Sequence, residues 1–399
     1  MSNRRILILT NRVPYPLNDG GNLAMQAMIE GYHNAGWQVY LLSMNTSRHL
    51  LGGDVLGSIY TNIFRFETVQ VNNDVKPLPT ALNFLLSKEP NHAVRFKSKA
   101  FSHAVKESIV LFKPDIVHVE SVFLTSYLPL IKRLTNATTI LRMHNIEWQV
   151  WERLANASTG VKRTYLSSLA KRISQYEPKA WAKYDLLLPI TDADAAIVIK
   201  ELPQAKQRVV PFGIKMGAIS PVAAGDWVGY HIGAMDWLPN AEAINWFIKE
   251  AWPVIHKQHP EFSFHFAGRN MPGSFQKAAI GGVTCYGEVA DANAFIADKK
   301  ILIVPLRSGG GIRVKILEAM VMGKIVISTA IGMQGIDAIP GTHFLEANTA
   351  AEFASAVDWV LSNKEQAEAI GRNAAALIHN RYDANTIQKG LITWLETHR

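Results

Sequence analysis

The sequence predicts an α/β protein of two domains, each built on a doubly wound parallel sheet. At 399 residues, the chain is longer than one hydrophobic core usually serves, since domains typically run to roughly 100–200 residues. Strand-like apolar runs alternate with helix-like stretches along most of the chain, which is typical of parallel sheets with crossover helices. Hydrophobic residues make up 48% of the chain and charged residues 19%, as in folded globular proteins.

The first half contains six strand candidates, several of them continuously apolar, as strands buried on both faces are. They are Ile6–Thr10, Val39–Ser43, Ile63–Val69, Ile116–Val119, Thr139–Met143 and Leu186–Ile190. A second series of five candidates follows a break in the pattern. It comprises Val228–Ile232, Phe262–Ala267, Val283–Tyr286, Ile301–Val304 and Ile325–Ser328.

Proline and glycine residues cluster between these two series, where a linker is expected. They are Pro203, Pro211, Gly213, Gly217 and Pro221. We therefore predict a first domain over residues 1–210 and a second over 211–380. The segment 381–399 is expected to form a helix that packs back on the first domain. Ligands should bind at the carboxyl ends of the strands, in a cleft between the two sheets.

The composition predicts a cytoplasmic protein. No apolar run reaches the roughly 18 residues needed to span a bilayer. Arg4 and Arg5 precede only a short apolar run, Ile6–Leu9, which is too short for a signal peptide. A single cysteine, Cys285, excludes an intrachain disulfide and agrees with a reducing compartment.

The net charge of +8 arises from the first half of the chain. Residues 1–200 carry 23 Lys and Arg against 15 Asp and Glu, whereas residues 201–399 carry 18 of each. A basic surface suggests an anionic partner, but the scattered charges and the lack of a recognised binding module argue against nucleic acid. Anionic lipid and a solvated surface without a partner remain open. The aromatic and basic segment Trp148–Lys183 suits either a membrane surface or a long helix packed on the first domain.

Two glycine-containing loops each connect a predicted strand to a predicted helix. The first carries Gly20 and Gly21, and the second runs from Ser308 to Gly311. Glycines let a backbone approach a ligand closely, and a helix N-terminus favours an anion. Neither loop has the three-glycine spacing of dinucleotide-binding enzymes, so both are also compatible with ordinary turns.

The second loop is followed by charged residues whose positions suggest a phosphate site. Arg313 and Lys315 fall at the start of a predicted helix that begins near Ile312. Cations there oppose the helix dipole unless an anion lies nearby, and a diphosphate would supply it. Glu318 lies further along the helix, where its carboxylate can accept hydrogen bonds from ribose hydroxyls. A solvated helix start is the alternative for all three.

These motifs resemble those of the family-4 retaining glycosyltransferases, which share the GT-B architecture of two Rossmann-like domains. The resemblance covers nearly the whole chain. It depends on the first glycine loop, on residues 142–147 (RMHNIE), 210–214 (VPFGI) and 232–235 (IGAM), and above all on Gly309–Met320. It implies a metal-independent enzyme that moves a sugar from a nucleotide diphosphate to an acceptor hydroxyl, with no cofactor. A glycan or a lipid-linked glycan is the acceptor that the family suggests, in surface polysaccharide synthesis.

The resemblance assigns roles to individual residues. His144 is implied to lie beside the donor sugar and to contribute to catalysis with Arg313 and Lys315. Residues implied to bind the donor are Gly20, Gly21, Arg269, Glu288, Val289, Gly309, Gly310, Gly311, Ile312 and Glu318. His118 and Glu120, which end a strand, are expected to line the acceptor side of the same cleft. No residue is expected to bind a metal.

The chain departs from the family pattern in two places. The family usually has two glutamates eight positions apart; Glu318 matches the second, but Gly310 stands where the first belongs. Residues 233–240 also lack the Arg and Lys that commonly contact the donor phosphates, and we expect Arg313 and Lys315, with Arg269, to replace them. A catalytically silent nucleotide-sugar-binding protein and a GT-B epimerase therefore remain alternatives.

Asp192 and Asp194 form the one acidic pair that resembles a metal-binding motif. They follow a strand and precede an apolar helix, directly after Thr191. Residues of these types at such a place are typical helix caps. We therefore predict a capping role, without a metal.

Overall fold

The computed structural model describes residues 4–17, 20–75, 77–87, 89–156, 158–214, 216, 225–276, 280–309 and 312–398. The chain divides into two compact units. Unit 1 comprises Met1–Gly213 together with Asn385–Arg399, and unit 2 comprises Ile214–Ala384. This division falls three residues after the boundary expected at 210/211, and the return to unit 1 comes four residues later than expected.

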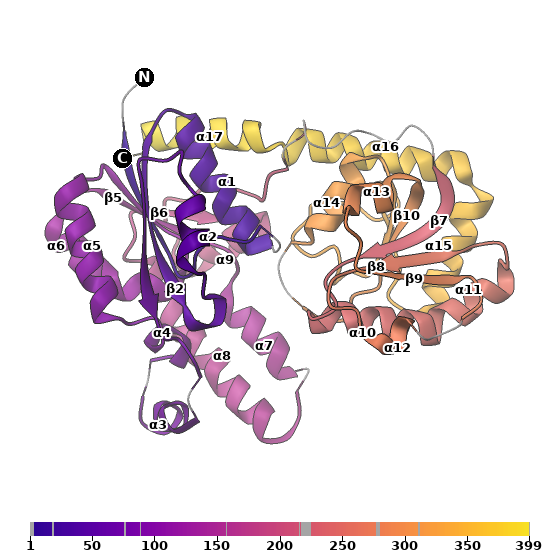
Figure 1. Cartoon of the computed structure of the whole chain (residues 1–399), viewed down its shortest axis with the longest axis horizontal. Coiled ribbons are helices and arrows are strands. Elements are labelled where there is room, and N and C mark those ends of the chain that lie inside the picture. Colours follow the sequence, from indigo (N-terminus) through magenta and orange to yellow (C-terminus); the bar gives the residue numbers. More distant parts are fainter. Residues whose placement is uncertain are drawn as a thin grey trace. The chain divides into compact units, whose positions relative to one another are not determined.

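Unit 1 is built on a six-stranded parallel sheet of order β3-β2-β1-β4-β5-β6 (Figure 1). All six predicted strands are confirmed, with bounds that differ by at most three residues. The strands are β1 (Arg5–Thr10), β2 (Gln38–Thr46), β3 (Arg65–Val71), β4 (Ile116–Val119), β5 (Thr138–Met143) and β6 (Leu186–Pro189).

The helices of unit 1 lie on both faces of this sheet. They are α1 (Gly20–Asn34), α2 (Gly53–Ser58), α3 (Pro77–Leu86), α4 (Asn91–Val94), α5 (Lys99–Phe112), α6 (Leu128–Leu134), α7 (Glu147–Asn156), α8 (Gly160–Trp181), α9 (Asp192–Glu201) and α17 (Ala384–Thr397). Short 3-10 turns are formed by Ser47–His49 and Val122–Tyr127.

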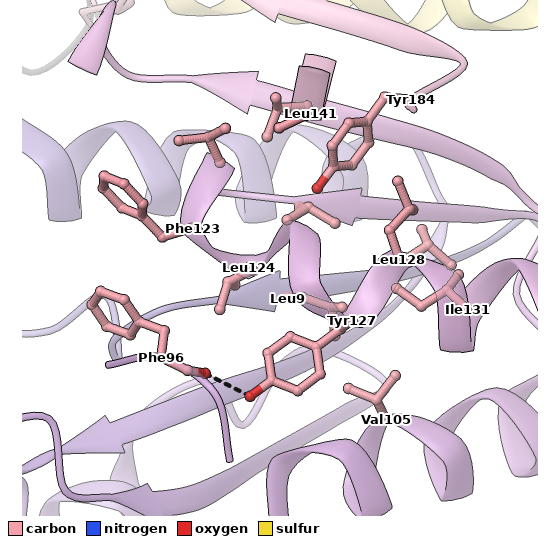
Figure 2. Close-up of a cluster of buried hydrophobic side chains, with 14 of the residues drawn as sticks. Leu9, Phe96, Val105, Phe123, Leu124, Tyr127, Leu128, Ile131, Leu141 and Tyr184 are labelled. Atoms are coloured by element: carbon pink, nitrogen blue, oxygen red, sulfur yellow. Dashed lines mark hydrogen bonds between the residues drawn. The ribbon is translucent and has the colours of Figure 1, made fainter. Parts of the chain in front are cut away.

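Successive residues of each central strand enter two different cores. Ile6 and Ile8 of β1 pack with side chains of α1 and α17, whereas Leu7 and Leu9 pack with those of α5 and α6. Figure 2 shows part of this second core, where the hydroxyl of Tyr127 donates a hydrogen bond of 2.6 Å to the carbonyl of Phe96. Because both faces of the sheet are buried, its strands read as continuous apolar runs.

The C-terminal helix α17 packs against α1 within unit 1 (Figure 1). Leu391 and Leu395 are buried in the core shared with β1. The Gln388 side-chain amide donates to the carbonyl of Ala27 at 3.0 Å. A Cβ at Gly31 would lie 2.2 Å from the Gln388 side chain, so glycine makes room for this contact.

Unit 2 repeats the same topology with a second parallel sheet of order β12-β11-β10-β7-β8-β9. The strands are β7 (Asp226–Ile232), β8 (Phe264–Ala267), β9 (Val283–Gly287), β10 (Lys299–Val304), β11 (Ile325–Ser328) and β12 (Leu345–Glu346). The five predicted strands are confirmed. The sixth, β12, was not predicted, because two residues carry no periodic signal.

Helices and a hydrophobic core of its own complete unit 2. The helices are α10 (Leu238–Trp246), a π-helical turn (Phe247–Ala251), α11 (Trp252–Gln258), α12 (Gly273–Gln276), α13 (Ala292–Ala297), α14 (Val314–Val321), α15 (Ala350–Ser362) and α16 (Lys364–Arg381). Phe264 and Phe266 of β8 and Ile301 of β10 pack against Phe247 and Phe353. The fold is therefore the predicted α/β architecture of two Rossmann-like units.

Both strand orders reverse beside the first strand of their unit. In unit 1 the reversal lies between β1 and β4, and in unit 2 between β7 and β10. In open parallel sheets, ligands bind at the carboxyl ends of the strands that flank such a reversal. The residues after β1, β4, β7 and β10 are thus the first places to look for a site.

Candidate functional sites

In unit 2, the loops after adjacent strands are joined by backbone hydrogen bonds. Gly233 donates to the carbonyl of Ala267 at 3.1 Å, and Gly268 donates to that of Gly287 at 2.8 Å. A Cβ at Gly268 would lie only 1.8 Å from the carbonyl oxygen of Gly233. Glycine is therefore required at residue 268, and the edge of the sheet beside the strand-order reversal is held rigidly.

Lys315, in the first turn of α14, holds the loop after β7 in place. Its ammonium group donates to Nε2 of His231 at 2.9 Å, to the carbonyl of Ile232 at 2.9 Å and to Oδ1 of Asn240 at 3.0 Å. His231 can accept at Nε2 because its Nδ1 donates to the carbonyl of Ile303 at 2.8 Å. Burial and the charge of Lys315 hold the pKa of His231 well below its usual value, so this ring is neutral.

This network changes the role expected for Lys315. An ammonium group has three hydrogens, and all three have acceptors within unit 2. Lys315 therefore has no hydrogen left to donate to a diphosphate in this arrangement, contrary to the expectation that it contacts the donor directly. Burial, followed by the charge of Arg313, lowers the pKa of Lys315 to about 7. A nearby anion would raise that pKa again.

Arg313 lies directly before α14, which begins at Val314, two residues later than predicted. Its guanidinium lies over the ring of Trp237, 5.1 Å from the ring centroid, and only 6% of the residue is exposed. Gly309 adjoins both side chains: its φ is 105°, and a Cβ there would lie 2.9 Å from Trp237. Sequence analysis could not predict this contact between Trp237 and Arg313, because the two residues are far apart in the chain.

Five further residues of unit 2 predicted to bind the donor lie within the described residues. Arg269 and Glu288 are exposed after β8 and β9, and Val289 is half-buried beside Glu288. Ile312 is half-buried just before α14, whereas Gly310 and Gly311 lie outside the described residues. Glu318 is half-buried on α14, where burial raises the pKa of its carboxyl group.

In unit 1, His144 follows β5 and binds a buried carboxylate at the end of β4. Nε2 of His144 lies 2.8 Å from Oε2 of Glu120. The other oxygen of Glu120 lies 3.0 Å from Nε2 of His118, whose Nδ1 lies 2.9 Å from the hydroxyl of Tyr32. Four side chains from α1, β4 and the ends of β4 and β5 thus lie in one row, in which Tyr32–His118 and Glu120–His144 are hydrogen bonds and His118–Glu120 is a contact at ion-pair distance. Spacing in the sequence could not predict this row.

Glu120 carries its negative charge inside the protein. Burial by itself disfavours the charged form, but His118 and His144 more than offset this and keep the pKa of Glu120 below its usual range. His118 and Glu120 are 0% and 1% exposed, whereas 22% of the His144 side chain is exposed. Of these three residues, only His144 can contact a ligand. The side chains of His118 and Glu120 are too deeply buried to contact an acceptor, contrary to the expectation.

The remaining residues singled out in unit 1 lie mainly at helix starts. Gly20 and Gly21 open α1 after β1, at the strand-order reversal. Thr191 caps α9 by accepting a hydrogen bond of 3.0 Å from the backbone of Asp194. The predicted helix start is confirmed, with Thr191 as the cap and Asp192 and Asp194 in the first turn. The segment Trp148–Lys183 was expected to be one long helix if it packs on the first domain, but it lies mainly in two helices, α7 and α8, that pack against each other.

Sequence analysis did not predict the pair of carboxyl groups that meets at the start of α7. Glu177 of α8 accepts hydrogen bonds from the backbone of Glu147 at 3.1 Å and of Trp148 at 2.8 Å. Glu177 of α8 thus accepts hydrogen bonds from the first backbone N–H groups of a different helix, α7. Burial, and then the nearby Glu147, raises the pKa of Glu177 to about 8, and burial raises that of Glu147 to about 7.

Metal-binding groups and membrane-spanning helices were looked for over all described residues. No three His, Cys, Asp or Glu side chains within the ranges given above are grouped so that they could hold a metal ion. Over the same residues, no helix has both the length and the apolar character needed to cross a membrane.

The sequence of unit 2 matches a known family. Residues 228–363 match the family described as glycosyl transferases group 1. The match lies within unit 2. The chain is also 23% identical over 403 residues to a Klebsiella pneumoniae protein described as an uncharacterized 44.6 kDa protein in cps region, covering 96% of this chain and 97% of that protein.

Solved structures share the fold over nearly the whole chain. Sucrose-phosphate synthase from Thermosynechococcus elongatus superposes with a TM-score of 0.69 at 15% identity, covering 99% of each chain. HepE of Anabaena in complex with UDP gives 0.67 at 14% identity, covering 98% of this chain and 100% of HepE. TarM gives 0.66 at 12% identity, covering 98% of each chain.

Proposed function

We propose that the protein is a retaining, metal-independent glycosyltransferase that moves a sugar from a nucleotide diphosphate sugar to a hydroxyl group of a glycan or lipid-linked acceptor. Surface polysaccharide synthesis is the proposed setting. The similarity to a protein in a cps region supports this setting, and the complex of HepE with UDP supports a nucleotide diphosphate as the donor's leaving group.

The observation that carries the proposal is the position of Arg313. It lies at the start of α14, which follows β10, one of the two strands that flank the strand-order reversal of unit 2. A cation there opposes the helix dipole, and the negative charge of a diphosphate would be favourable both to the guanidinium and to the helix start. Lys315 is proposed to add its charge from behind, without a direct contact.

In the proposed reaction, these charges stabilise the diphosphate as it leaves the sugar. For a retaining enzyme, a leaving-group oxygen helps to take the proton of the acceptor hydroxyl, so that the new bond forms on the face that the diphosphate leaves. Glu318, on the same helix, is proposed to accept hydrogen bonds from the ribose. Arg269, Glu288 and Val289 are proposed to complete the donor site.

Calorimetric titration with UDP tests this site. Arg313→Ala should weaken UDP binding by about tenfold to a hundredfold, since charge-assisted hydrogen bonds to phosphate contribute about 1.5–3 kcal/mol each. Arg372→Ala, which removes an arginine from α16, is the matched control and should leave the affinity unchanged. Equal affinity of Arg313→Ala and the unaltered protein would remove the basis of the proposal.

Two alternatives remain distinguishable by experiment. Because Gly310 replaces a glutamate of the family motif, a silent nucleotide-sugar-binding protein is the first alternative, and it would bind UDP-sugar without hydrolysing or transferring it. A GT-B epimerase is the second, and it would interconvert donor sugars without an acceptor. Following the anomeric configuration of a product by NMR spectroscopy separates all three and tests retention.

A peripheral contact of unit 1 with an anionic membrane is also proposed. At the start of α8, Val161 is 88% exposed beside the exposed Lys162 and Arg163, and Leu154 at the end of α7 is 43% exposed. Apolar and basic side chains together favour an anionic lipid surface. Val161→Asp should reduce co-sedimentation with phosphatidylglycerol vesicles, while phosphatidylcholine vesicles should bind neither protein.

A further inference from the structure

We propose that Glu120 is a positioning residue that fixes His144 as the Nε2–H tautomer, so that Nδ1 of His144 accepts a hydrogen bond from a sugar hydroxyl. The proposal deepens the proposed function, because the hydroxyl belongs to one of the two sugars of that reaction. It assigns the buried side chains Glu120, His118 and Tyr32 to the support of one exposed ring.

The first step of the argument follows from the charge of Glu120. An ionised carboxylate only accepts hydrogen bonds. Its two oxygens lie 2.8 Å from Nε2 of His144 and 3.0 Å from Nε2 of His118. Nε2 of His144, which forms the hydrogen bond to this carboxylate, must therefore carry the hydrogen. In a neutral ring, the other nitrogen then holds a lone pair.

The second step follows from the far end of the chain. If Nδ1 of His118 holds a lone pair, the Tyr32 hydroxyl 2.9 Å away must donate to it. Tyr32 keeps that proton, because burial and then the charge of Glu120 raise its pKa above the usual value. Tyr32 thus supports the ring of His118, which lies against the carboxylate at ion-pair distance.

Arg142 of β5 adds a positive charge near Glu120. It is 2% exposed, interacts electrostatically with Glu120, and donates from Nη1 to the carbonyl of Val210 at 2.8 Å. An opposite charge nearby favours the ionised form of a carboxyl group.

The position of His144 makes its free nitrogen useful. The ring follows β5, beside β4, which flanks the strand-order reversal of unit 1. The contacts described above occupy only Nε2, and part of the side chain is exposed. A lone pair at Nδ1 selects a donor such as a hydroxyl group and rejects a carbonyl or a phosphate oxygen. The chain therefore determines which kind of ligand atom His144 can bind.

Nitrogen-15 NMR spectroscopy of the full-length protein labelled at histidine tests the tautomer directly. In the unaltered protein, Nδ1 of His144 should resonate as an unprotonated ring nitrogen and Nε2 as a protonated one. In Glu120→Gln, the side-chain amide can donate to Nε2, so the tautomer should change. A protonated Nδ1 in the unaltered protein, or an identical spectrum in the variant, would overturn the proposal.

A matched control exists on the surface. His103 and Glu107 form another histidine–glutamate pair, 3.2 Å apart and largely exposed. Glu107→Gln should leave the resonances of His144 unchanged. Tyr32→Phe keeps Glu120 and provides a second test if Glu120→Gln does not fold. It removes the hydrogen bond to Nδ1 of His118, so the resonance of that nitrogen should shift, while His144 should keep its tautomer. A changed tautomer of His144 in this variant would contradict the proposal.

Turnover measurements test the consequence separately from the proposed function. Glu120→Gln should lower kcat by about 10²-fold, the lower end of the usual effect of a positioned proton acceptor, while UDP affinity stays the same. Glu120→Asp, which keeps the charge, should restore part of this loss. An altered tautomer with unaltered kcat would overturn the positioning role. If no glycosyl transfer is found with any sugar, the NMR result still decides the tautomer.

Discussion

The ammonium group of Lys315 joins α14 to β7 and to the loop that follows. It shapes the edge of the sheet where Arg313 lies. Sequence analysis could not predict these hydrogen-bond partners, because they belong to residues more than seventy positions away in the chain.

We expect Lys315→Met to destabilise unit 2. The methionine fills similar space but leaves the acceptors of His231, Ile232 and Asn240 without their donor. A buried acceptor left unsatisfied costs about 1–3 kcal/mol, so the free energy of unfolding should fall by about 2 kcal/mol or more in urea denaturation. Lys257→Met, at an exposed position of α11, should have little effect. Equal losses in both variants would show that the network contributes nothing.

The carboxyl pair Glu147 and Glu177 predicts a pH dependence at the residue scale. Their pKa values of about 7 and about 8 lie above the ordinary 4.5. Between pH 4.5 and these raised pKa values, the folded protein binds more protons than the unfolded chain, so its stability falls as the pH rises. The contribution is complete below about pH 4.5 and is lost as the pH passes 7 and 8.

Glu147→Gln tests this dependence because it removes one acid and its repulsion of Glu177. The difference in melting temperature between the variant and the unaltered protein should grow in favour of the variant by roughly 2–4 °C as the pH rises from 5 to 9. This is equivalent to about 1 kcal/mol for a unit of this size. Glu152→Gln, at an exposed position of the same helix, serves as the control. A constant difference across this pH range would contradict the prediction.

At the scale of elements, strands were predictable and the fine structure of the site was not. Continuous apolar runs such as Ile116–Val119 have few alternatives in a chain of this composition, and β4 has the predicted bounds. Local caps such as Thr191 were also predictable, because a cap and its partner lie three residues apart. By contrast, Glu177 satisfies the start of α7 from α8, and Trp237 covers Arg313 from another loop. Such contacts depend on tertiary structure and leave no periodic trace.

The docking of α17 on unit 1 gives a prediction at the element scale. Leu391 is fully buried in the core that also contains Ile6 and Ile8. Leu391→Ala should lower the free energy of unfolding by about 2–5 kcal/mol, as for other buried leucines. Lys389→Ala, at an exposed position of the same helix, should change it little. Chemical denaturation followed by circular dichroism measures both.

At the scale of the whole molecule, the two units are expected to differ in whether a continuous fragment can fold. Unit 2 is continuous from Ile214 to Ala384 and has its own core, whereas unit 1 needs both ends of the chain. We expect the fragment 214–384 to unfold cooperatively by itself. The fragment 1–213 should be markedly less stable, because it exposes the core face that α17 covers.

A synthetic peptide of residues 384–399 provides the test for unit 1. Added in excess, it should raise the urea midpoint of the fragment 1–213, since a ligand that binds only the folded state stabilises it by mass action. The same peptide with Leu391 and Leu395 replaced by Ser is the control. If the fragment is as stable without peptide as with it, α17 is not part of this core.

The discontinuity of unit 1 has a further consequence. Unit 2 begins and ends at one place, because Ile214 donates to the carbonyl of Tyr382 at 2.7 Å and accepts from Ala384 at 3.0 Å. To unit 1, the whole of unit 2 is therefore an insertion with adjoining ends, and the entropy of closing such an insertion grows only slowly with its length. We therefore expect that unit 2 can be replaced at these two joints by another unit with adjoining ends without loss of the fold of unit 1.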